Sequence, residues 1–465
     1  MSPERFDLVA IGGGLAGLTA GLRALELGAR AAVLECSDDP RHLCASRVNG
    51  GILHVAFRSV RTEPSALEHA IADATRGCAQ PRPARALANN AARATEWLAS
   101  CGAQYTRIEP DEGWKDRILS PAGFYASNGF AWRDLGPDRV MVELEARIER
   151  SGGALIRGAR ATGLVVRNGR CIAVEVDDRI LDSDAVVLAD GGFHGNRDML
   201  RRFVTPHPES LKLRGPGSAY GDGIRFAEAA GARLVGMEAF YGHLLSADSL
   251  NRDGLSPFPF LDLLATTGMI VGMDGKRFVD EGRGPHAMAN ALARHGTGIG
   301  MVVFDDAMWR SAGRDFFCPP NPNLVERGGT LHAARDMPTL ARKAGLPPDA
   351  LRHAIGSRSL GHASMDHSID ARRAKYGAMP FATPPFYAAP ACAGITHTMG
   401  GVAVDEHARV LDTRDRPIPG LYAAGATCGG LEGGPDAAYV GGLVPAVVFG
   451  LLAAEHAATA RRQSD

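Results

Sequence analysis

The stretch FDLVAIGGGLAGLTAGLRALELGARAAVLE, residues 6–35, decides the fold. An apolar run of strand length, residues 6–11, leads directly into glycines with the spacing G-x-G-x-x-G. Leucines at positions 15, 18, 22 and 25 then recur at helical spacing, and residues 31–34 form a second short apolar run. A strand, a helix and a second strand in this order predict a βαβ unit whose helix begins at the glycines.

The spaced glycines and the acid that ends the second strand predict a nucleotide site. The first glycine allows a tight turn, the second lets the backbone approach a pyrophosphate, and the third lets the helix pack closely on the strand. The helix N-terminus adds amide donors and partial positive charge. The acid is placed to accept hydrogen bonds from an unphosphorylated ribose, which favours FAD or NAD over NADP. The expected contacts are Gly12, Gly14, Leu15, Ala16, Gly17 and Glu35.

The composition limits the class of protein. The chain has 465 residues, which is enough for two or three domains, and a net charge of −1, which gives no argument for nucleic acid or an anionic membrane as partner. The first strand begins by residue 6, which leaves no room for a signal peptide, and the apolar run at 443–454 is too short to span a membrane. The eight cysteines are scattered without metal-binding spacing, so we expect no metal and a cytoplasmic protein with reduced thiols.

Three glycine-bearing segments lie far from the first unit. Small residues and paired glycines occupy 44–51, a glycine pair follows an apolar run at 184–188, and a strand-like segment at 420–425 runs into another glycine. A plain NAD dehydrogenase seldom needs such a segment near its C-terminus, whereas a large flavin gripped at both ends does, so FAD is favoured. The further expected cofactor contacts are Cys44, Ser46, Gly50, Gly51, Asp190, Gly191, Gly425, Ala426, Leu443 and Val444.

The amino-acid composition and the expected secondary structure change in the middle of the chain. Residues 236–356 contain more Pro, Asp and Arg and show weaker alternation of strands and helices than the segments on either side. We therefore expect an α/β fold in which a Rossmann-like FAD-binding domain is discontinuous, with residues 1–235 and 357–465, and residues 236–356 form an inserted α+β capping domain.

Several different short motifs follow one another in a specific order along nearly the whole chain. They are residues 12–17 with Glu35, 187–193, 221–232, 275–281, 385–387, 396–401 and 419–425. Together they resemble the fumarate reductase and succinate dehydrogenase flavoprotein superfamily, and within it the tricarballylate dehydrogenase and 3-ketosteroid dehydrogenase types. The resemblance implies non-covalent FAD and a capping domain over the flavin ring. In this family a hydride passes between flavin N5 and a substrate carbon, so that C–C single and double bonds interconvert beside a carboxylate or ketone.

The resemblance also implies residues that bind the substrate. His397 in THTMGG and His243 in YGHL are similar to histidines that bind a substrate carboxylate in fumarate reductases, since an imidazole donates hydrogen bonds to an oxyanion near neutral pH. Gly442, in the late glycine motif, is expected to contact the substrate as well. Tyr241 and Arg133 are weaker candidates.

The chain departs from the fumarate reductases at two positions. Pro285 stands where they carry a proton-donating arginine, so the neighbouring Arg283 and His286 become the candidate catalytic residues. Tyr439 stands near the place of an arginine clamp, and a tyrosine cannot bind a carboxylate in bidentate fashion. Tyr439 is instead a catalytic candidate that polarises a carbonyl, as a tyrosine does in ketosteroid dehydrogenases. These departures argue against fumarate or succinate as the substrate.

Three functions stay open from the sequence. The leading interpretation is an FAD-dependent oxidoreductase that acts on a C–C bond beside the carboxylate or ketone of a small molecule. No haem motif or second nucleotide motif is visible, so its electron donor or acceptor is external. The second is a ketosteroid-type dehydrogenase, which an apolar segment with Phe258 and Phe260 permits. The third is a non-catalytic electron-transfer flavoprotein subunit, and a covalent flavin link through Cys44 is a minor alternative to non-covalent binding.

Overall fold

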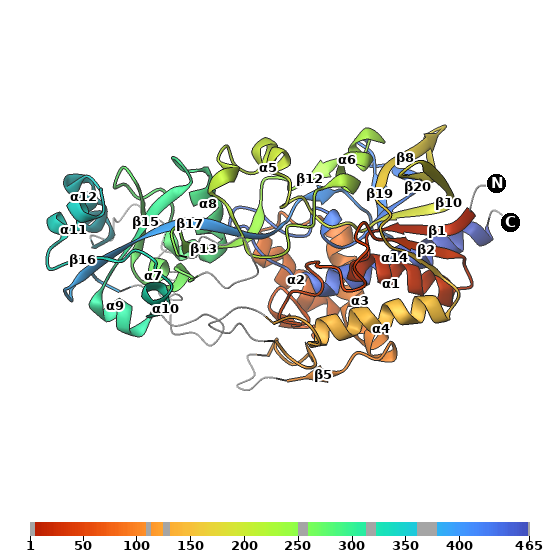
Figure 1. Ribbon diagram of the computed structural model, residues 1–465, viewed down its shortest axis with the longest axis horizontal. Helices are drawn as coiled ribbons and strands as arrows, with labels where there is room; N and C mark the ends of the chain where they lie inside the picture. The colour runs from red at the N-terminus through yellow and green to blue at the C-terminus, as the bar shows by residue number, and fades with distance from the viewer. Residues whose placement is uncertain are drawn as a thin grey trace.

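Two β-sheets lie toward opposite ends of an elongated molecule, and both chain termini lie at the end that holds the first sheet (Figure 1). The structure is a computed structural model. It describes residues 5–107, 113–123, 131–249, 259–312, 322–359 and 379–463.

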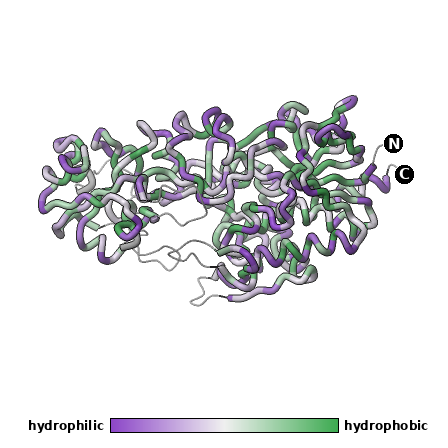
Figure 2. Tube along the Cα trace, in the orientation of Figure 1, coloured by the Kyte–Doolittle hydropathy of each residue, from purple (hydrophilic) through white to green (hydrophobic). Residues whose placement is uncertain are grey.

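The first sheet has eight strands and is built around the N-terminal βαβ unit. The strands are β1 (Arg5–Ile11), β2 (Ala31–Leu34), β7 (Ala154–Ile156), β8 (Ala161–Arg167), β9 (Arg170–Val176), β10 (Arg179–Leu188), β19 (Arg409–Leu411) and β20 (Pro417–Ala423). The main path runs β19-β20-β10-β1-β2-β7, and its neighbours from β20 to β7 are parallel. The inner strands are continuous apolar runs, which is typical of parallel strands covered on both faces (Figure 2).

Long helices pack against this sheet and against one another. They are α1 (Leu15–Glu26), α2 (Pro64–Thr75), α3 (Pro81–Ser100), α4 (Gly136–Arg150) and α14 (Leu443–Arg462). Gly17 stands where a Cβ would lie 2.0 Å from the Gly12 carbonyl oxygen, so only glycine lets α1 pack this closely on its strand. Among the described helices, α14 is long and apolar enough to cross a membrane by length and composition, so the apolar run is longer than expected. Its residues Val447, Phe449 and Ala453 are buried in the core of this part of the molecule.

The second sheet has six strands and is centred on β17 (Phe386–Thr398). The other strands are β11 (Lys212–Leu213), β13 (Phe240–Ser246), β14 (Met269–Gly272), β15 (Ile299–Asp305) and β16 (His332–Ala334). The surrounding helices are α7 (Asp262–Thr267), α8 (Pro285–Arg294), α9 (Asp306–Ser311), α10 (Pro322–Glu326), α11 (Met337–Lys343) and α12 (Pro348–Ser359) (Figure 1).

Short elements complete the part of the chain that the structure describes. They are β3 (His54–Val55), β4 (Arg58–Ser59), β5 (Tyr105–Thr106), β6 (Ile118–Leu119), α5 (Arg197–Phe203), α6 (Asp222–Ala229), β12 (Leu234–Val235) and β18 (Gly401–Val402). The antiparallel pair β12–β18 joins the segment between β11 and β13 to the segment that follows β17.

The strand pairing differs from the expected division at β11 and β17. Both strands lie outside residues 236–356, yet both hydrogen-bond within the second sheet. The sequence of β17, FYAAPACAGITHT, is rich in small apolar residues, and it gives no local signal of which sheet it joins. The α/β class with a nucleotide-binding sheet is confirmed, while the division into domains stays a prediction.

Candidate active site

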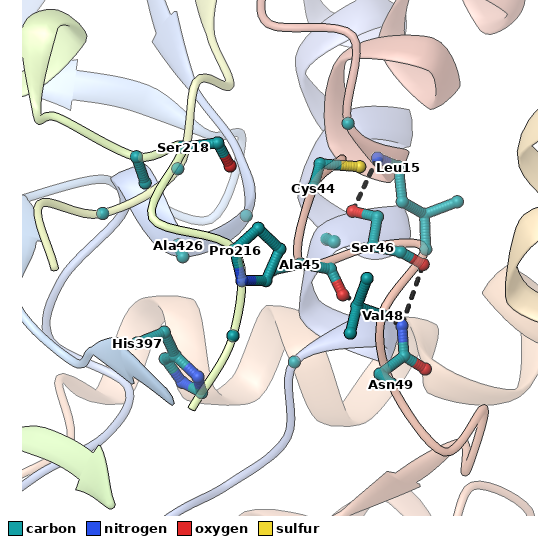
Figure 3. A pocket seen from close by; sticks show the side chains of 18 of the residues that line it. Leu15, Cys44, Ala45, Ser46, Val48, Asn49, Pro216, Ser218, His397 and Ala426 are labelled. Atoms are coloured by element: carbon teal, nitrogen blue, oxygen red, sulfur yellow. Dashed lines mark hydrogen bonds between the residues drawn. The ribbon is translucent and has the colours of Figure 1, made fainter. Parts of the chain in front are cut away.

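A cavity of about 500 Å³ extends from the start of α1 to the second sheet. Its walls therefore combine both ends of the sequence with the strands β13 and β17. In Figure 3, His397 lies on the side that carries Pro216 and Ala426, across from the segment of Cys44, Ser46 and Asn49. The predicted residues that line the cavity are Gly12, Gly14, Leu15, Ala16, Glu35, Cys44, Ser46, Gly50, Gly51, Asp190, Gly191, His243, His397, Gly425, Ala426, Tyr439, Gly442 and Leu443.

The glycine turn at the start of α1 has the geometry expected of a pyrophosphate site. Gly12 has a φ of +110°, and a Cβ there would lie 2.5 Å from the Ala189 carbonyl oxygen. A Cβ at Gly14 would lie 3.4 Å from the Ser46 hydroxyl oxygen, and the Gly14 backbone lines the cavity. Because backbone is exposed to the cavity beside a helix N-terminus, a negatively charged group is favoured there.

The segment that follows the second strand is fastened to the same helix. The Leu15 amide donates to the Ser46 hydroxyl oxygen at 3.0 Å, and the Asn49 side-chain amide donates to the Ser46 carbonyl oxygen at 2.8 Å (Figure 3). Burial raises the pKa of the Cys44 thiol to about 11, so this thiol stays protonated near neutral pH.

Glu35 is buried and held in place by backbone donors. The Gly13 amide donates to one of its carboxylate oxygens at 3.0 Å, and the Ser37 amide donates to the other at 2.9 Å. The His42 ring, which the sequence analysis missed, also lines the cavity with its Nε2 3.4 Å from the Glu35 carboxylate. Burial lowers the pKa of His42, so its imidazole is neutral near pH 7.

A second glycine turn joins the cavity to the C-terminal part of the chain. The Gly223 amide donates to the Asp190 carboxylate at 2.8 Å, and the Gly191 amide donates to the Thr427 hydroxyl oxygen at 3.1 Å. Burial raises the pKa of Asp190 to about 6. Asp190 therefore fixes the backbone of this turn to the start of α6. Of the remaining predicted contacts, Val444 is buried in α14 and does not line the cavity.

Aromatic rings and imidazoles gather where the cavity meets the second sheet. Tyr241 in β13 is paired with His397 in β17, so the strand register places their rings 5.3 Å apart. Tyr241 also stacks on Tyr439 at 4.3 Å and lies 5.4 Å from the His243 ring. Burial, together with the nearby Tyr241 and Glu432, raises the pKa of Tyr439 well above its usual value, so this phenol remains a hydrogen-bond donor.

A chain of polar groups runs behind these rings. His243 Nδ1 lies 2.6 Å from a carboxylate oxygen of Asp262, and His243 Nε2 lies 3.4 Å from the Tyr241 hydroxyl oxygen. Burial, followed by the positive charge of Arg214, lowers the pKa of His243. In the neutral ring, Nδ1 therefore carries the proton toward Asp262, and Nε2 is free to accept from Tyr241. His397 makes a separate contact, with its Nε2 3.4 Å from the Glu432 carboxylate.

The two candidate proton donors that flank Pro285 lie outside the cavity. Arg283 Nε pairs with the Asp436 carboxylate at 2.6 Å, and its Nη2 donates to the Pro435 carbonyl oxygen. His286 Nδ1 lies 2.7 Å from the Gly242 carbonyl oxygen, and burial lowers the pKa of His286 to about 3. This geometry gives no support to either residue as the group that moves the proton.

Several lining residues were not found from the sequence. Arg214, His194, Trp114 and Phe57 line the cavity, and Asp262 stands behind His243. None belongs to a motif whose spacing indicates a site, because each reaches this place through tertiary packing. The weaker candidate Arg133 is exposed with its guanidinium over Trp132. Phe258 lies outside the described residues, whereas Phe260 lines the cavity.

Comparison with known proteins identifies the nucleotide. The sequence profile of the FAD-binding domain family matches residues 7–437. The chain belongs to the FAD-binding domain family. This membership confirms the predicted resemblance and FAD as the cofactor, and its curated relatives are oxidoreductases. The protein is thus an FAD-dependent oxidoreductase.

Individual relatives share both sequence and fold. The NADH:acrylate oxidoreductase of Vibrio harveyi is 31% identical over 68% of this chain, which spans 31% of that protein. A probable fumarate reductase, Ifc3, of Shewanella frigidimarina is 25% identical over 98% of this chain and 75% of its own length. The 3-ketosteroid Δ1-dehydrogenase of Sterolibacterium denitrificans superimposes with a TM-score of 0.72 at 20% identity, over 98% of this chain and 100% of that one, which shows the same fold.

The residues of the FAD-binding cavity fit this cofactor. The Gly14 backbone, which lines the cavity at the start of α1, suits the pyrophosphate, and the Glu35 carboxylate, fixed by backbone donors, suits a ribose. Both ring nitrogens of His42 and Nδ1 of His194 are buried without a hydrogen-bond partner within the described residues, and both rings line the cavity. Polar atoms of the cofactor would satisfy these nitrogens, whose burial without a partner is otherwise costly.

Proposed function

We propose that this oxidoreductase interconverts a C–C single bond and a C=C double bond beside the carboxylate or ketone of a small molecule. The observation that carries the proposal is the cavity itself, which leads from the FAD-binding backbone to a group of hydrogen-bonding rings from the second sheet. The names of two relatives support it, since acrylate and fumarate each hold a C=C bond beside a carboxylate. When bound, FAD supplies the two-electron carrier that accepts or gives the hydride.

Within this reaction we assign the proton to the polar chain that ends at Tyr241. In the direction of reduction, a hydride adds to one carbon of the double bond and a proton adds to its neighbour. The Tyr241 hydroxyl is placed to deliver that proton. The phenolate that remains then takes up a proton from solvent by way of His243, whose Nε2 binds and passes on the proton while the Asp262 carboxylate stabilises the doubly protonated ring and fixes its orientation. The reverse reaction returns the hydride to the flavin and the proton to the same chain, so atoms and electrons balance in both directions.

The remaining rings hold the substrate oxygen atoms. His397, on the strand beside Tyr241, is placed to donate to a carboxylate or carbonyl oxygen. Tyr439, protonated because burial raises its pKa, donates in the same way. These donors stabilise the enolate-like charge that develops on oxygen as the bond order changes. Arg283 and His286 stay weaker candidates for the proton, because neither is among the residues that line the cavity.

A flat ketone of the steroid type is the second candidate substrate. Phe57, Trp114 and Phe260 line the cavity, and the His54, Phe57, Trp114 and Tyr439 rings form one aromatic group with centroids 4.9–6.1 Å apart. Such a wall suits an apolar ring system. A non-catalytic electron-transfer subunit is the weakest interpretation, because hydrogen-bonding rings line the same cavity as the FAD-binding backbone.

The way FAD is held and its electron partner complete the proposal. We propose non-covalent FAD, because the raised pKa of Cys44 leaves little thiolate for a flavin link. The electron donor or acceptor is external. The seven cysteines among the described residues are all unpaired, which supports a reducing, cytoplasmic location. The burial of α14 in the core supports the absence of a membrane span.

Single-turnover kinetics tests the proposed reaction. The holoenzyme is reduced without oxygen and mixed with acrylate, fumarate, cinnamate and an unsaturated ketosteroid, and the flavin absorbance is followed. We expect reoxidation with at least one unsaturated acid or ketone and formation of its saturated product. A flavin that stays reduced with every compound, in a preparation that oxygen reoxidises normally, would contradict the proposal.

A further inference from the structure

Arg214 is a cation on the cavity wall that the sequence motifs do not reveal. It follows β11, and its backbone amide donates to the Ile395 carbonyl oxygen at 2.9 Å. The side chain lines the cavity together with His243 and His397. Its Nη1 donates to the Thr396 hydroxyl oxygen at 2.6 Å, and its Cζ lies 4.7 Å from the centre of the Phe260 ring. The guanidinium is therefore held both in position and in orientation.

The local backbone explains why Thr396 reaches this arginine. Tyr241 pairs with His397, whereas the next residue of β13, Gly242, pairs with Ile395, so the register skips Thr396. Such a bulge turns a side chain away from the regular alternation of the strand. The bulge requires glycine at position 242, because a Cβ there would lie only 2.2 Å from the Gly394 carbonyl oxygen.

The charge of Arg214 has no carboxylate partner among the described residues. The other arginine on the described cavity wall, Arg160, is paired with Asp222 at 2.5 Å. The hydroxyl of Thr396 takes only part of the donor capacity of the Arg214 guanidinium. A partly buried cation with donors left over and a fixed plane is the arrangement that binds a carboxylate in bidentate fashion.

We infer that Arg214 binds the substrate carboxylate and so replaces, from the segment after β11, the arginine clamp near whose place Tyr439 stands. The inference rests on the proposed function and narrows its substrate class. One unpaired arginine and an aromatic wall of Phe57, Trp114 and Phe260 select a single carboxylate joined to a C=C bond and an apolar body. Among the described residues of the cavity wall no second unpaired arginine is present for a second carboxylate, and a neutral ketone would leave the charge of Arg214 without a partner.

Ligand binding to the oxidised holoenzyme tests the role of Arg214. The probes are cinnamate, its neutral amide cinnamamide, and the dicarboxylate fumarate, each titrated against the flavin absorbance. We expect the wild type to bind cinnamate more tightly than either of the others. Arg214→Gln should weaken cinnamate binding about 30-fold or more, because a charge-assisted pair is lost, and should leave cinnamamide within about threefold. Arg214→Lys should lie between, since it keeps the charge without the fork.

Matched variants and turnover separate the possible outcomes. Arg202→Gln removes an exposed arginine that pairs with Glu228 on the surface, and it should change none of the three affinities. The flavin-to-protein ratio confirms that each variant is folded. Equal loss of cinnamate and cinnamamide binding in Arg214→Gln, unchanged cinnamate binding, or a wild type that prefers fumarate or the amide overturns the inference. If any of these occurs while a C=C substrate still reoxidises the flavin, the inference fails and the proposed function stands.

Discussion

The two ends of the FAD-binding cavity are built in different ways. At the nucleotide end the motif that marks the site, the glycine turn from Gly12 together with Glu35, lies within one short unit of the sequence, residues 12–35. At the substrate end the contacts come from side chains on β13, β17 and the segment after β11, which are far apart in the sequence. The first end serves a cofactor shared by many proteins, whereas the second sets the substrate. Changes at the first end should therefore abolish cofactor binding, and changes at the second should alter chemistry while FAD stays bound.

The largest effect is expected from Gly17→Val. A Cβ at this position would lie 2.0 Å from the Gly12 carbonyl oxygen, so α1 must move away from its strand, at a cost of about 3 kcal/mol or more. We expect a protein that is purified without flavin and unfolds at a much lower temperature. Gly28→Ala is the matched control, since a Cβ there meets no atom within 4 Å and only the φ of +81° costs about 1 kcal/mol. Normal flavin content in Gly17→Val would contradict the account of the nucleotide end.

The next largest effect is expected from Tyr241→Phe. Loss of the hydroxyl removes the group at the end of the polar chain, so the turnover number should fall by about 10²-fold or more while flavin content and ligand binding persist. Tyr422→Phe serves as the matched control, because the Tyr422 hydroxyl lies 3.0 Å from the His456 ring beside the first sheet. Reduction rates in both solvents, H₂O and D₂O, show whether proton transfer has slowed. Turnover that survives in Tyr241→Phe and collapses in Arg283→Gln would instead favour the arginine predicted from the motif.

A smaller effect concerns the pH dependence of stability near the substrate end. Burial lowers the pKa of His286 from 6.5 to about 3, so the unfolded chain binds a proton that the folded chain refuses between these values. The contribution of His286 to the free energy of unfolding is fully present above pH 6.5 and is lost as the pH falls toward 3. His286→Gln should flatten this dependence by an amount on the order of 1 kcal/mol, measured as the unfolding temperature from pH 7 to pH 4.

A second histidine provides the comparison for that measurement. His69 is exposed on α2, and His69→Gln should leave the pH profile unchanged. A profile that is equally steep in wild type and His286→Gln would show that His286 titrates normally in the folded protein.

The smallest effect is expected from Cys44→Ser. Because the pKa of this thiol is raised to about 11, we expect no bond to the flavin and an unchanged flavin content. Flavin should leave both the wild type and the variant on denaturation and pass through a filter that retains the chain. Flavin that stays with denatured wild type but leaves denatured Cys44→Ser would demonstrate a covalent link.

The same contrast explains what the sequence predicts. The sequence predicts the turn at Gly12 and the role of Glu35, because the strand, the glycines, the helix and the acid follow one another within one unit. The sheet to which β17 belongs could not be predicted, because the small apolar residues of this strand suit either sheet. The role of Arg214 could not be predicted from the sequence, because it depends on contacts with Thr396 and Phe260 that form only in the folded chain. His243 and His397 were found from their motifs, but the link from His243 to Asp262 was not.

A crystal structure of the holoenzyme with cinnamate tests the central claim most directly. The central claim is that backbone at one end of the cavity binds FAD and that the reactive flavin ring then faces the side chains of Tyr241 and His397 at the other end. We expect the flavin ring between Leu443 and the Tyr241 and His397 rings, with the ligand carboxylate on Arg214. A flavin ring that lies away from this group, or a ligand that binds elsewhere on the protein, would contradict the account.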